Sequence, residues 1–500
     1  MAESTAPAAS VELAVAAPPP VPYAIALERW DVPGLPGLHS MVSAVHAGKV
    51  VLLGGRRNGL HGFPAGRDLV TTPSFPRTEA NDEVFVLDLA AKKLLGRKSV
   101  KTLPPALAGQ LAANNLEATT RGGFLYLVGG YGVSPEAKTL TTLPRVTAVR
   151  LDALIATVLD PAKRLDLAFA AANMPTATHL ALAVTGGELG LFGDTFALVF
   201  GHRYEGEYTP GGGQADQSYT SSVRAFRFTL ADGPKPKLDV KYLGENPDRT
   251  NGAPPDNPFH RRDLVVASSV TPDGNPALLA LGGVFKGGQM EGYITPVTVT
   301  PNASAPVGLE VAEDSQGQQL LSHYACAHVA LFDRPKKALY TLLFGGISQY
   351  HWDKTAHKLI RDPQDLSKGI DGLPFIDSVS TLVRTPKSGG GIETVQYLHD
   401  DQTFPPAGAA PTCAGTGGAQ APAMSLGAEA DFILDPRVAT LNGDVVDLAA
   451  LTAPMPLGWI VGGIAATAPY GAQGPTCAST GIYRVSIDPK RANPVTRLSL

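Results

Sequence analysis

The sequence predicts an all-β protein built from one repeated unit of four antiparallel strands. Three observations support this fold class. An apolar strand that ends in one or two glycines recurs six times along the 500 residues. The chain contains 54 Gly and 43 Pro, spread throughout, as expected for many turns between short elements. Few segments keep the apolar period of a helix, the best being residues 145–159 and 447–454, so helix should be minor.

The composition allows a large buried core and argues against two classes of partner. Hydrophobic residues make up 44% of the chain and charged residues 17%. The formal net charge is −4, without a long run of either sign, so nucleic acid is not an expected partner. No stretch of about 18 uninterrupted apolar residues predicts a membrane-spanning helix. Residues 1–22, rich in Ala and Pro, are expected to form a flexible arm, and residues 23–500 a single domain.

The recurring strand is expected to be the second of each unit. It reads KVVLLGG at 49–55, FLYLVGG at 124–130, TFALVFG at 195–201, PALLALGG at 276–283, LYTLLFGG at 339–346 and LGWIVGG at 457–463. Another apolar strand precedes each copy, and a strand of alternating type follows, most clearly DEVFVLDL at 82–89. A final edge strand, such as 237–243 or 393–400, would complete four strands per unit.

The glycine pairs suggest how the units assemble. A strand that ends at the crowded rim of a central channel needs φ angles and close backbone approaches that a Cβ would obstruct. A four-stranded sheet with two apolar faces must also stack on neighbours, and a closed ring of such sheets covers every face.

The strand that ends in Gly-Gly and the third strand of the DEVFVLDL type are the two features in which the chain resembles the kelch family of β-propellers. The resemblance covers residues 23–500. It implies a six-bladed kelch-like β-propeller with four antiparallel strands per blade and long inter-strand loops. The wide interval from Gly346 to Gly462 leaves seven blades as an alternative. Residues 23–32 and 495–500 are expected as outer strands of the sixth blade, which would remove a free edge.

In such a blade the loop that enters the first strand and the loop after the glycines emerge on the same face. Polar and aromatic residues there would suit a small polar molecule, a glycan or an acidic peptide loop, although any one of them could simply bond neighbouring backbone. The candidate residues of this face are Arg56, Arg57, His61, Glu117, His202, Arg203, Tyr204, His260, Arg261, His323, Tyr350, His351 and Trp352. The same loops also carry His39, Asn114, Asn115, Tyr131, Arg262, Tyr324 and Glu429.

The sequence contains no P-loop, GxSxG, HExxH or CxxC motif. We therefore expect first a non-enzymatic binding or assembly protein that recognises a protein or carbohydrate partner. The alternative is a pore-mouth enzyme acting on a sugar or small polar substrate. Such an enzyme would be similar either to the six-bladed kelch-like sialate mutarotase or to the copper-radical oxidases, which also use a propeller. Tyr324, Cys326 and His328 would share one side of a strand and could bind a soft metal, but a buried core position is the stronger expectation for them. We expect no metal or other cofactor.

Two of the three cysteines, Cys413 and Cys477, have similar surroundings in loops that should emerge on the same face. They could form a disulfide or remain two free loop thiols. A disulfide would indicate maturation in an oxidising compartment, periplasmic or extracellular; without it, a cytoplasmic protein is expected.

Overall fold

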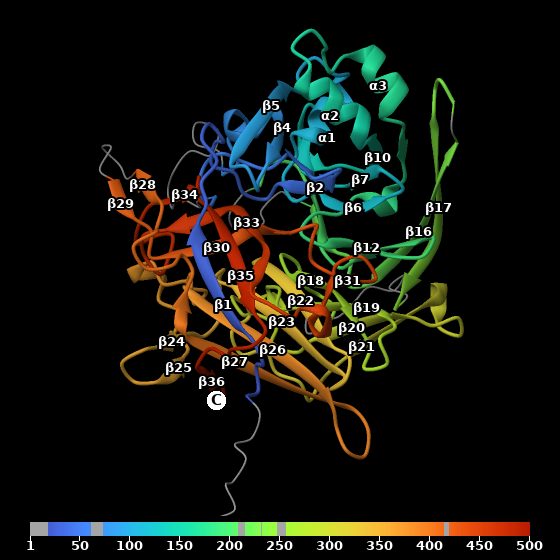
Figure 1. Cartoon of the computed structure of the whole chain (residues 1–500). Helices are drawn as coiled ribbons and strands as arrows, with labels where there is room; N and C mark the ends of the chain where they lie inside the picture. Colours follow the sequence, from blue (N-terminus) through green and yellow to red (C-terminus); the bar gives the residue numbers. More distant parts are fainter. Residues whose placement is uncertain (1–18, 62–73, 209–215, 232, 248–256, 415–419) are drawn as a thin grey trace, which may run out of the picture.

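The computed structural model describes residues 19–61, 74–208, 216–231, 233–247, 257–414 and 420–500. It is all-β, as predicted: four-stranded antiparallel sheets dominate, and three α-helices occur among these residues. The helices α1 (Pro105–Leu111), α2 (Leu151–Leu159) and α3 (Leu167–Asn173) gather on one side of the molecule, near β4, β5 and β10 (Figure 1). Of the expected helix at 145–159 only the second half is helical, and 447–454 contains only a 3-10 turn at Leu448–Ala450.

Six sheets have a core of four antiparallel strands, and we number them in chain order. Sheet one contains β2 (Val42–His46), β3 (Lys49–Leu53), β4 (Glu83–Asp88) and β5 (Lys93–Ser99). Sheet two contains β6 (Glu117–Arg121), β7 (Phe124–Val128), β10 (Arg145–Arg150) and β11 (Thr176–Thr178). Sheet three contains β12 (Glu188–Phe192), β13 (Thr195–Val199), β16 (Val223–Ala231) and β17 (Lys237–Asn246).

Sheet four contains β18 (Val265–Val270), β19 (Pro276–Leu281), β20 (Val297–Pro301) and β21 (Leu309–Glu313). Sheet five contains β22 (Ala327–Asp333), β23 (Ala338–Phe344), β26 (Ser378–Pro386) and β27 (Ile392–Thr403). Sheet six contains β30 (Ser425–Leu434), β33 (Met455–Ala466), β35 (Ile482–Asp488) and β1 (Ala24–Arg29).

Smaller strands extend this framework. The loops after two glycine motifs form another four-stranded sheet, which we call the loop sheet: β8 (Tyr131–Ser134), β9 (Thr139–Thr142), β14 (His202–Glu205) and β15 (Asp216–Tyr219). Two hairpins are formed by β24 (His351–Asp353) with β25 (Lys358–Ile360) and by β28 (Thr412–Ala414) with β29 (Gln420–Pro422). The others are β31 (Thr440–Leu441), β32 (Val445–Asp447), β34 (Thr476–Ala478) and β36 (Val495–Arg497).

The two ends of the chain pair with different sheets. β1 pairs antiparallel with β35 along its whole length, from Ala24 opposite Asp488 to Arg29 opposite Tyr483 (Figure 1). The segment 495–500, which we expected beside it in the sixth unit, instead places β36 against β27 of sheet five. The outer edge of β35 is already occupied by β1, whereas the long strand β27 still offers a free edge. Val21, which we assigned to the arm, is buried in the core between sheets five and six.

The strands are apolar on both faces because each sheet packs between two others. In β7, for example, Leu125 and Leu127 pack toward sheet one, whereas Phe124, Tyr126 and Val128 pack toward sheet three. Further clusters join sheets three and four, four and five, five and six, and finally six and one. The first strands follow the same order: β2 contacts β6, β6 contacts β12, and the sequence continues through β18, β22 and β30 back to β2.

The glycine motifs lie where successive sheets touch. Five of them donate a backbone N–H to the next sheet's first strand or to the segment before it: Gly55 to Ala113 (2.9 Å), Gly130 to Val184 (2.9 Å), Gly201 to Arg261 (3.1 Å), Gly346 to Leu426 at the start of β30 (3.3 Å) and Gly463 to Leu38 (2.8 Å). The motif of sheet three has only one glycine because Phe200 takes the place of the first. Phe200 keeps the left-handed conformation (φ +55°), and its buried ring stacks on Phe259 at 5.7 Å between centroids.

Candidate functional site

A residue in the left-handed backbone region lies just before the first strand of five sheets and, in sheet six, within the first half of β30. These residues are Ser40, Asn115, Gly186, Asp263, Ala325 and Glu429, with φ between +39° and +68°. Four backbone hydrogen bonds join neighbouring members: from Ser40 to Glu429 (3.1 Å), Asn115 to Ser40 (3.1 Å), Asp263 to Gly186 (2.7 Å) and Glu429 to Ala325 (2.8 Å). We call these six residues the left-handed ring. Five of them are not glycine, so the contacts between sheets must hold a conformation that these residues otherwise rarely adopt.

A pocket of about 80 Å3 lies on the left-handed ring. Its floor consists of Ser40, Asn115, Asp263 and Glu429. Residues directly before a ring member supply part of the wall: His39, Asn114, Thr185, Arg262 and Tyr324. Residues directly after a glycine motif supply another part: Arg56, Tyr131, His202 and Ile464. The remaining lining residues are Leu60, His61, Phe75, Tyr204 and Tyr208.

One wall of the pocket is aromatic. The ring of His61 lies 4.9 Å from that of Phe75 and 5.1 Å from that of Tyr208, measured between centroids. Phe75 also lies 5.4 Å from Tyr131, and Tyr204 lies 4.9 Å from Tyr208. Tyr131 and Tyr204 belong to the loop sheet, which therefore positions half of this wall. Such side chains offer apolar faces together with hydroxyl or imidazole groups.

Four of the thirteen candidate residues line this pocket, namely Arg56, His61, His202 and Tyr204. The other members of the same loops that line it are His39, Asn114, Asn115, Tyr131, Arg262, Tyr324 and Glu429. Sequence reasoning did not single out Ser40, Phe75, Thr185, Tyr208 or Asp263. Ser40, Thr185 and Asp263 could have been found from their equivalent positions in the repeat. Phe75 and Tyr208 lie in long loops, where no sequence pattern marks them.

Two of the candidates lie one residue away from the pocket and hold the loops in place. Arg261 is fully buried, and its guanidinium donates to the carbonyls of Pro258 (2.7 Å), Gly282 (3.0 Å) and Thr295 (3.1 Å). His323 is also fully buried between the carbonyl of Gly345 (2.7 Å) and the hydroxyl of Ser380 (2.7 Å). In both cases the following residue, Arg262 or Tyr324, reaches the pocket instead.

The other candidates make local contacts outside the pocket. Arg57 donates to Glu83 (2.7 Å) and to Asn81 (2.9 Å), and Arg203 pairs with Glu205. The ring of His260 stacks on Tyr219 at 3.8 Å.

The cluster of Tyr350, His351 and Trp352 also lies outside the pocket, at the hairpin of β24. Tyr350 and Trp352 pack on a small core that contains Leu320 and Leu321. Nδ1 of His351 lies 3.6 Å from a carboxylate oxygen of Asp362.

Arg56 brings a buried positive charge to the pocket. Arg56 is 3% exposed. Its Nε donates to the side-chain oxygen of Asn58 (3.0 Å), and its Nη2 donates to the carbonyl of Pro76 (3.0 Å). The guanidinium also lies 4.9 Å from the centroid of the Phe75 ring. No carboxylate of the described residues lies within ion-pair distance of Arg56, and no hydrogen bond of its Nη1 is formed among them. Burial lowers the pKa of Arg56 to about 10, so it is cationic at neutral pH.

Arg262 is instead paired, and it fixes the state of a histidine. Its Nε lies 3.2 Å from Asp263, its Nη1 bonds Nδ1 of His202 (2.6 Å) and its Nη2 donates to the hydroxyl of Tyr208 (3.1 Å). Because a guanidinium can only donate, Nδ1 of His202 accepts, and any ring proton must lie on Nε2. Burial and then the charge of Arg262 hold the pKa of His202 well below its usual value, so this imidazole is neutral.

The other pocket histidines and the floor residue Glu429 also favour their neutral forms. Burial, followed by the neighbouring arginines, lowers the pKa of both His39 and His61 to about 3. Burial and then Asp263 raise the pKa of Glu429 to about 8, although Asn115 donates to its carboxylate at 3.1 Å. Burial also raises the pKa of Asp263, which shares a hydrogen bond with the Tyr324 hydroxyl. Within the described residues Arg56 forms no ion pair, although the charge of Glu79, beyond ion-pair distance, offsets part of the effect of burial on its pKa.

A larger cavity of about 850 Å3 lies under the left-handed ring and is lined by the first strands of the six sheets. Ser40, Asn115, Asp263 and Glu429 line both cavities, so the ring separates them. The candidate residue Glu117 lies in the lower cavity, where it is 3% exposed and accepts a hydrogen bond from the backbone of Gly187 (3.0 Å).

The three residues considered as a soft-metal set do not act together. Tyr324 lines the pocket, Cys326 is buried against the core between sheets four and five, and Nδ1 of His328 bonds the Cys326 carbonyl (3.1 Å). Burial raises the pKa of the Cys326 thiol to about 12. Within the described residues no three His, Cys, Asp or Glu side chains are grouped so that they could hold a metal ion.

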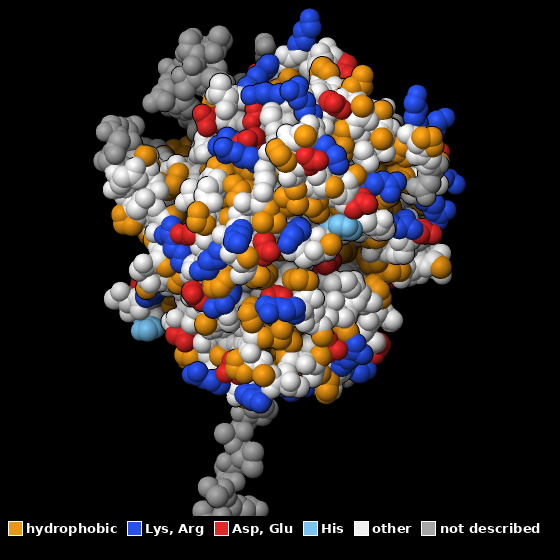
Figure 2. All heavy atoms as spheres, turned by 45° about the horizontal axis from the view of Figure 1, so that its top comes forward, with side chains coloured by type: hydrophobic (Ala, Val, Ile, Leu, Met, Phe, Trp, Pro, Cys, Tyr) orange, Lys and Arg blue, Asp and Glu red, His pale blue; other side chains and the backbone are white. Residues whose placement is uncertain are grey.

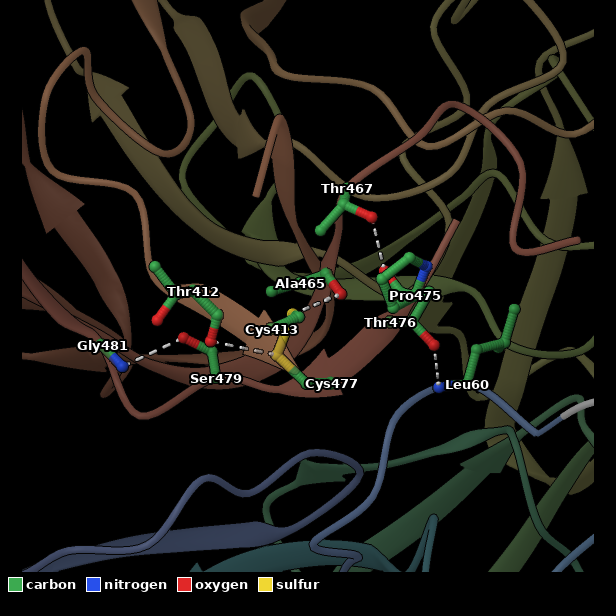
Figure 3. The surroundings of a disulfide bond; sticks show 10 residues. All are labelled: Leu60, Thr412, Cys413, Ala465, Thr467, Pro475, Thr476, Cys477, Ser479 and Gly481. Carbon is green, nitrogen blue, oxygen red and sulfur yellow. Dashed lines mark hydrogen bonds between the residues drawn. A yellow bond between two sulfur atoms is a disulfide. The ribbon is translucent and has the colours of Figure 1, made fainter. Parts of the chain in front are cut away.

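Cys413 and Cys477 form a disulfide with an S–S distance of 2.03 Å, which confirms the first of the two alternatives for this pair (Figure 3). The bond links the hairpin of β28 to β34, the extra strand at the end of β33. The third cysteine, Cys326, is free and buried.

No family model matches the chain, and no curated protein matches it. One solved structure, described as "Structure of YjhT", is 11% identical in sequence and covers 74% of this chain and 95% of its own, with a TM-score of 0.37. A likeness at this level supports no inference about function. None of the helices in the described part of the chain is long and apolar enough to cross a membrane.

Proposed function

We propose that the six sheets are the blades of a six-bladed, kelch-like β-propeller. The contacts between first strands run in one cycle from β2 through β6, β12, β18 and β22 to β30, which contacts β2 again. The glycine motif of each sheet lies against the next sheet's first strand or the segment before it, and the motif of sheet six lies against Leu38 before sheet one. The disulfide supports maturation in an oxidising compartment.

We further propose that the chain is a binding protein whose pocket accepts the anionic group of a carbohydrate-type ligand. Arg56 is the observation that carries this proposal, because its buried guanidinium forms no ion pair with a carboxylate of the described residues, and such a charge is costly unless a ligand supplies the opposite one. The aromatic wall offers faces for a sugar ring, and the polar floor offers groups for its hydroxyls. Basic and acidic side chains are interspersed on the face seen in Figure 2, where no broad charged surface favours nucleic acid.

A matched pair of arginines tests the proposal. Glucuronate should bind more tightly than its neutral counterpart glucose, and Arg56→Gln should weaken glucuronate binding by about 10- to 100-fold, because one charge-assisted hydrogen bond contributes about 1.5–3 kcal/mol. Arg57→Gln, which changes the neighbouring residue outside the pocket, should leave the affinity unchanged. Isothermal titration calorimetry measures all four affinities, and circular dichroism checks that each variant folds. Equal affinity for both sugars, equal losses in both variants, or binding only of acidic peptides would overturn the proposal.

An enzyme acting on the same ligand is the second candidate function. It is favoured by Glu429, whose pKa of about 8 suits an acid–base group at neutral pH, and by the neutral imidazole of His202. In that case Glu429→Gln should lower the rate at which the anomers of a bound uronic acid interconvert by about 100-fold or more, without a comparable loss of affinity. Polarimetry follows this reaction. A protein that binds glucuronate but leaves the spontaneous rate unchanged is a binding protein only.

A further inference from the structure

Strand β34 supports the wall of the pocket from behind. Gly59 lies so close to Thr476 that a Cβ on it would come within 3.0 Å of the Thr476 carbonyl oxygen, and Gly37 approaches Ala478 in the same way. The hydroxyl of Thr476 accepts a hydrogen bond from the backbone of Leu60 at 3.0 Å (Figure 3). Leu60 and the following His61 both line the pocket, so β34 determines where this part of the wall lies.

β34 itself depends on the disulfide. It has only three residues, and it pairs only with the end of β33, from Ile464 to Ala466. So short a strand at a sheet edge is weakly held by its ladder alone. The disulfide ties its central residue, Cys477, to Cys413, which is 1% exposed in the core between sheets five and six. The covalent bond therefore connects a buried, fixed position to the strand that carries Thr476.

We propose that the disulfide Cys413–Cys477 positions the wall of the ligand pocket through Thr476 and Leu60, and that its reduction loosens that wall. The effect of this disulfide on ligand binding rests on the proposed function, whereas its structural link to the pocket wall does not. A dithiol supplies the electrons. Its thiolate attacks the more exposed sulfur, on Cys477, and Cys413 leaves as a thiolate that takes up a proton. The second thiol of the reagent then displaces Cys477 as a thiol and leaves the reagent as a cyclic disulfide.

Hydrogen exchange tests this link without a ligand. In the oxidised protein the Leu60 amide should be protected, and reduction with a dithiol should raise its exchange rate at least tenfold. Thr476→Val, which removes the acceptor but keeps the disulfide and the side-chain shape, should raise it similarly. Peptides from β16, in sheet three, serve as the control and should change less than twofold under both conditions.

The results separate this inference from the proposed function. Unchanged exchange at Leu60 after verified reduction, or in Thr476→Val, would overturn it. An equal rise in β16 would mean a general loosening and would also overturn it. The absence of glucuronate binding to the oxidised protein would instead refute the proposed ligand while leaving the exchange result intact. If both the proposed function and the disulfide link hold, reduction of the disulfide should weaken glucuronate binding while the contacts of Arg56 stay the same.

Discussion

Gly345→Ala is expected to lower the free energy of unfolding by about 4 kcal/mol or more, which is in the range of the most damaging single substitutions. Gly345 has φ +60°, and a Cβ there would come well within 3.0 Å of the backbone carbonyl oxygen of Leu426, at the start of β30. A backbone atom cannot turn aside as the end of a flexible side chain can. The substitution must therefore push sheets five and six apart or distort the turn between them.

Gly193 provides the matched control. It has nearly the same backbone angle, φ +59°, in the turn between β12 and β13, but no atom lies within 4 Å of the position that its Cβ would occupy. Gly193→Ala should cost only about 1–2 kcal/mol, the ordinary penalty for a left-handed residue with a Cβ. Chemical denaturation of both variants measures the difference. Similar losses in the two variants would show that the glycine motif is required for its backbone angle and not for contact between sheets.

This comparison shows how far the sequence could explain the repeat. The recurrence of an apolar strand with glycines is visible in the sequence, and it predicts both the all-β class and a crowded position at the end of each strand. It does not reveal which atoms crowd the glycine. Those atoms belong to the next sheet, and only the fold brings Leu426 against Gly345 or Leu38 against Gly462.

The site could be predicted to the level of the loops but not of the side chains. In the segments that precede β18 and β22, the position of the loops pointed to Arg261 and His323 together with their neighbours Arg262 and Tyr324, and only Arg262 and Tyr324 reach the pocket. Asp263, which directly follows Arg262, has a left-handed backbone. The alternation of side chains along β18 therefore does not extend backward through Asp263 to Arg262. An alignment of the six repeats on their left-handed residue would have given the correct register.

The aromatic wall could be predicted only in part: His61, Tyr131 and Tyr204 were expected on this face, whereas Phe75 and Tyr208 were not. Phe75 and Tyr208 lie in long loops, and nothing local marks them as different from Tyr350 or Trp352, which lie in another such loop and pack on a separate core. Loop side chains are placed by contacts between distant segments, and His61 with Phe75 and Tyr208 is such a contact.

The contribution of the lower-cavity carboxyl groups to stability is expected to fall as the pH rises from about 5 to 8, because these groups are held protonated in the folded state. Burial raises the pKa of Glu188 to about 8, and burial followed by the charge of Glu188 raises the pKa of Glu117 well above its usual value. The folded state therefore keeps protons that the unfolded state releases above about pH 4.5. Each such proton lowers the free energy of unfolding by up to about 1.4 kcal/mol per pH unit within this window.

Glu117→Gln isolates this effect, since the amide oxygen can still accept the hydrogen bond from Gly187 while the titrating proton is lost. The variant should match the wild type in stability near pH 4.5 and exceed it increasingly toward pH 8, by up to about 1.4 kcal/mol per pH unit, because only the wild type has a titrating carboxyl group at that position. Glu310→Gln, on the exposed edge strand β21, is the control and should not change the slope. Urea denaturation from pH 4.5 to 8.5 measures it. A stability difference between Glu117→Gln and the wild type that stays constant with pH would show that the buried carboxyl is ionised in the folded state, its charge compensated within the cavity.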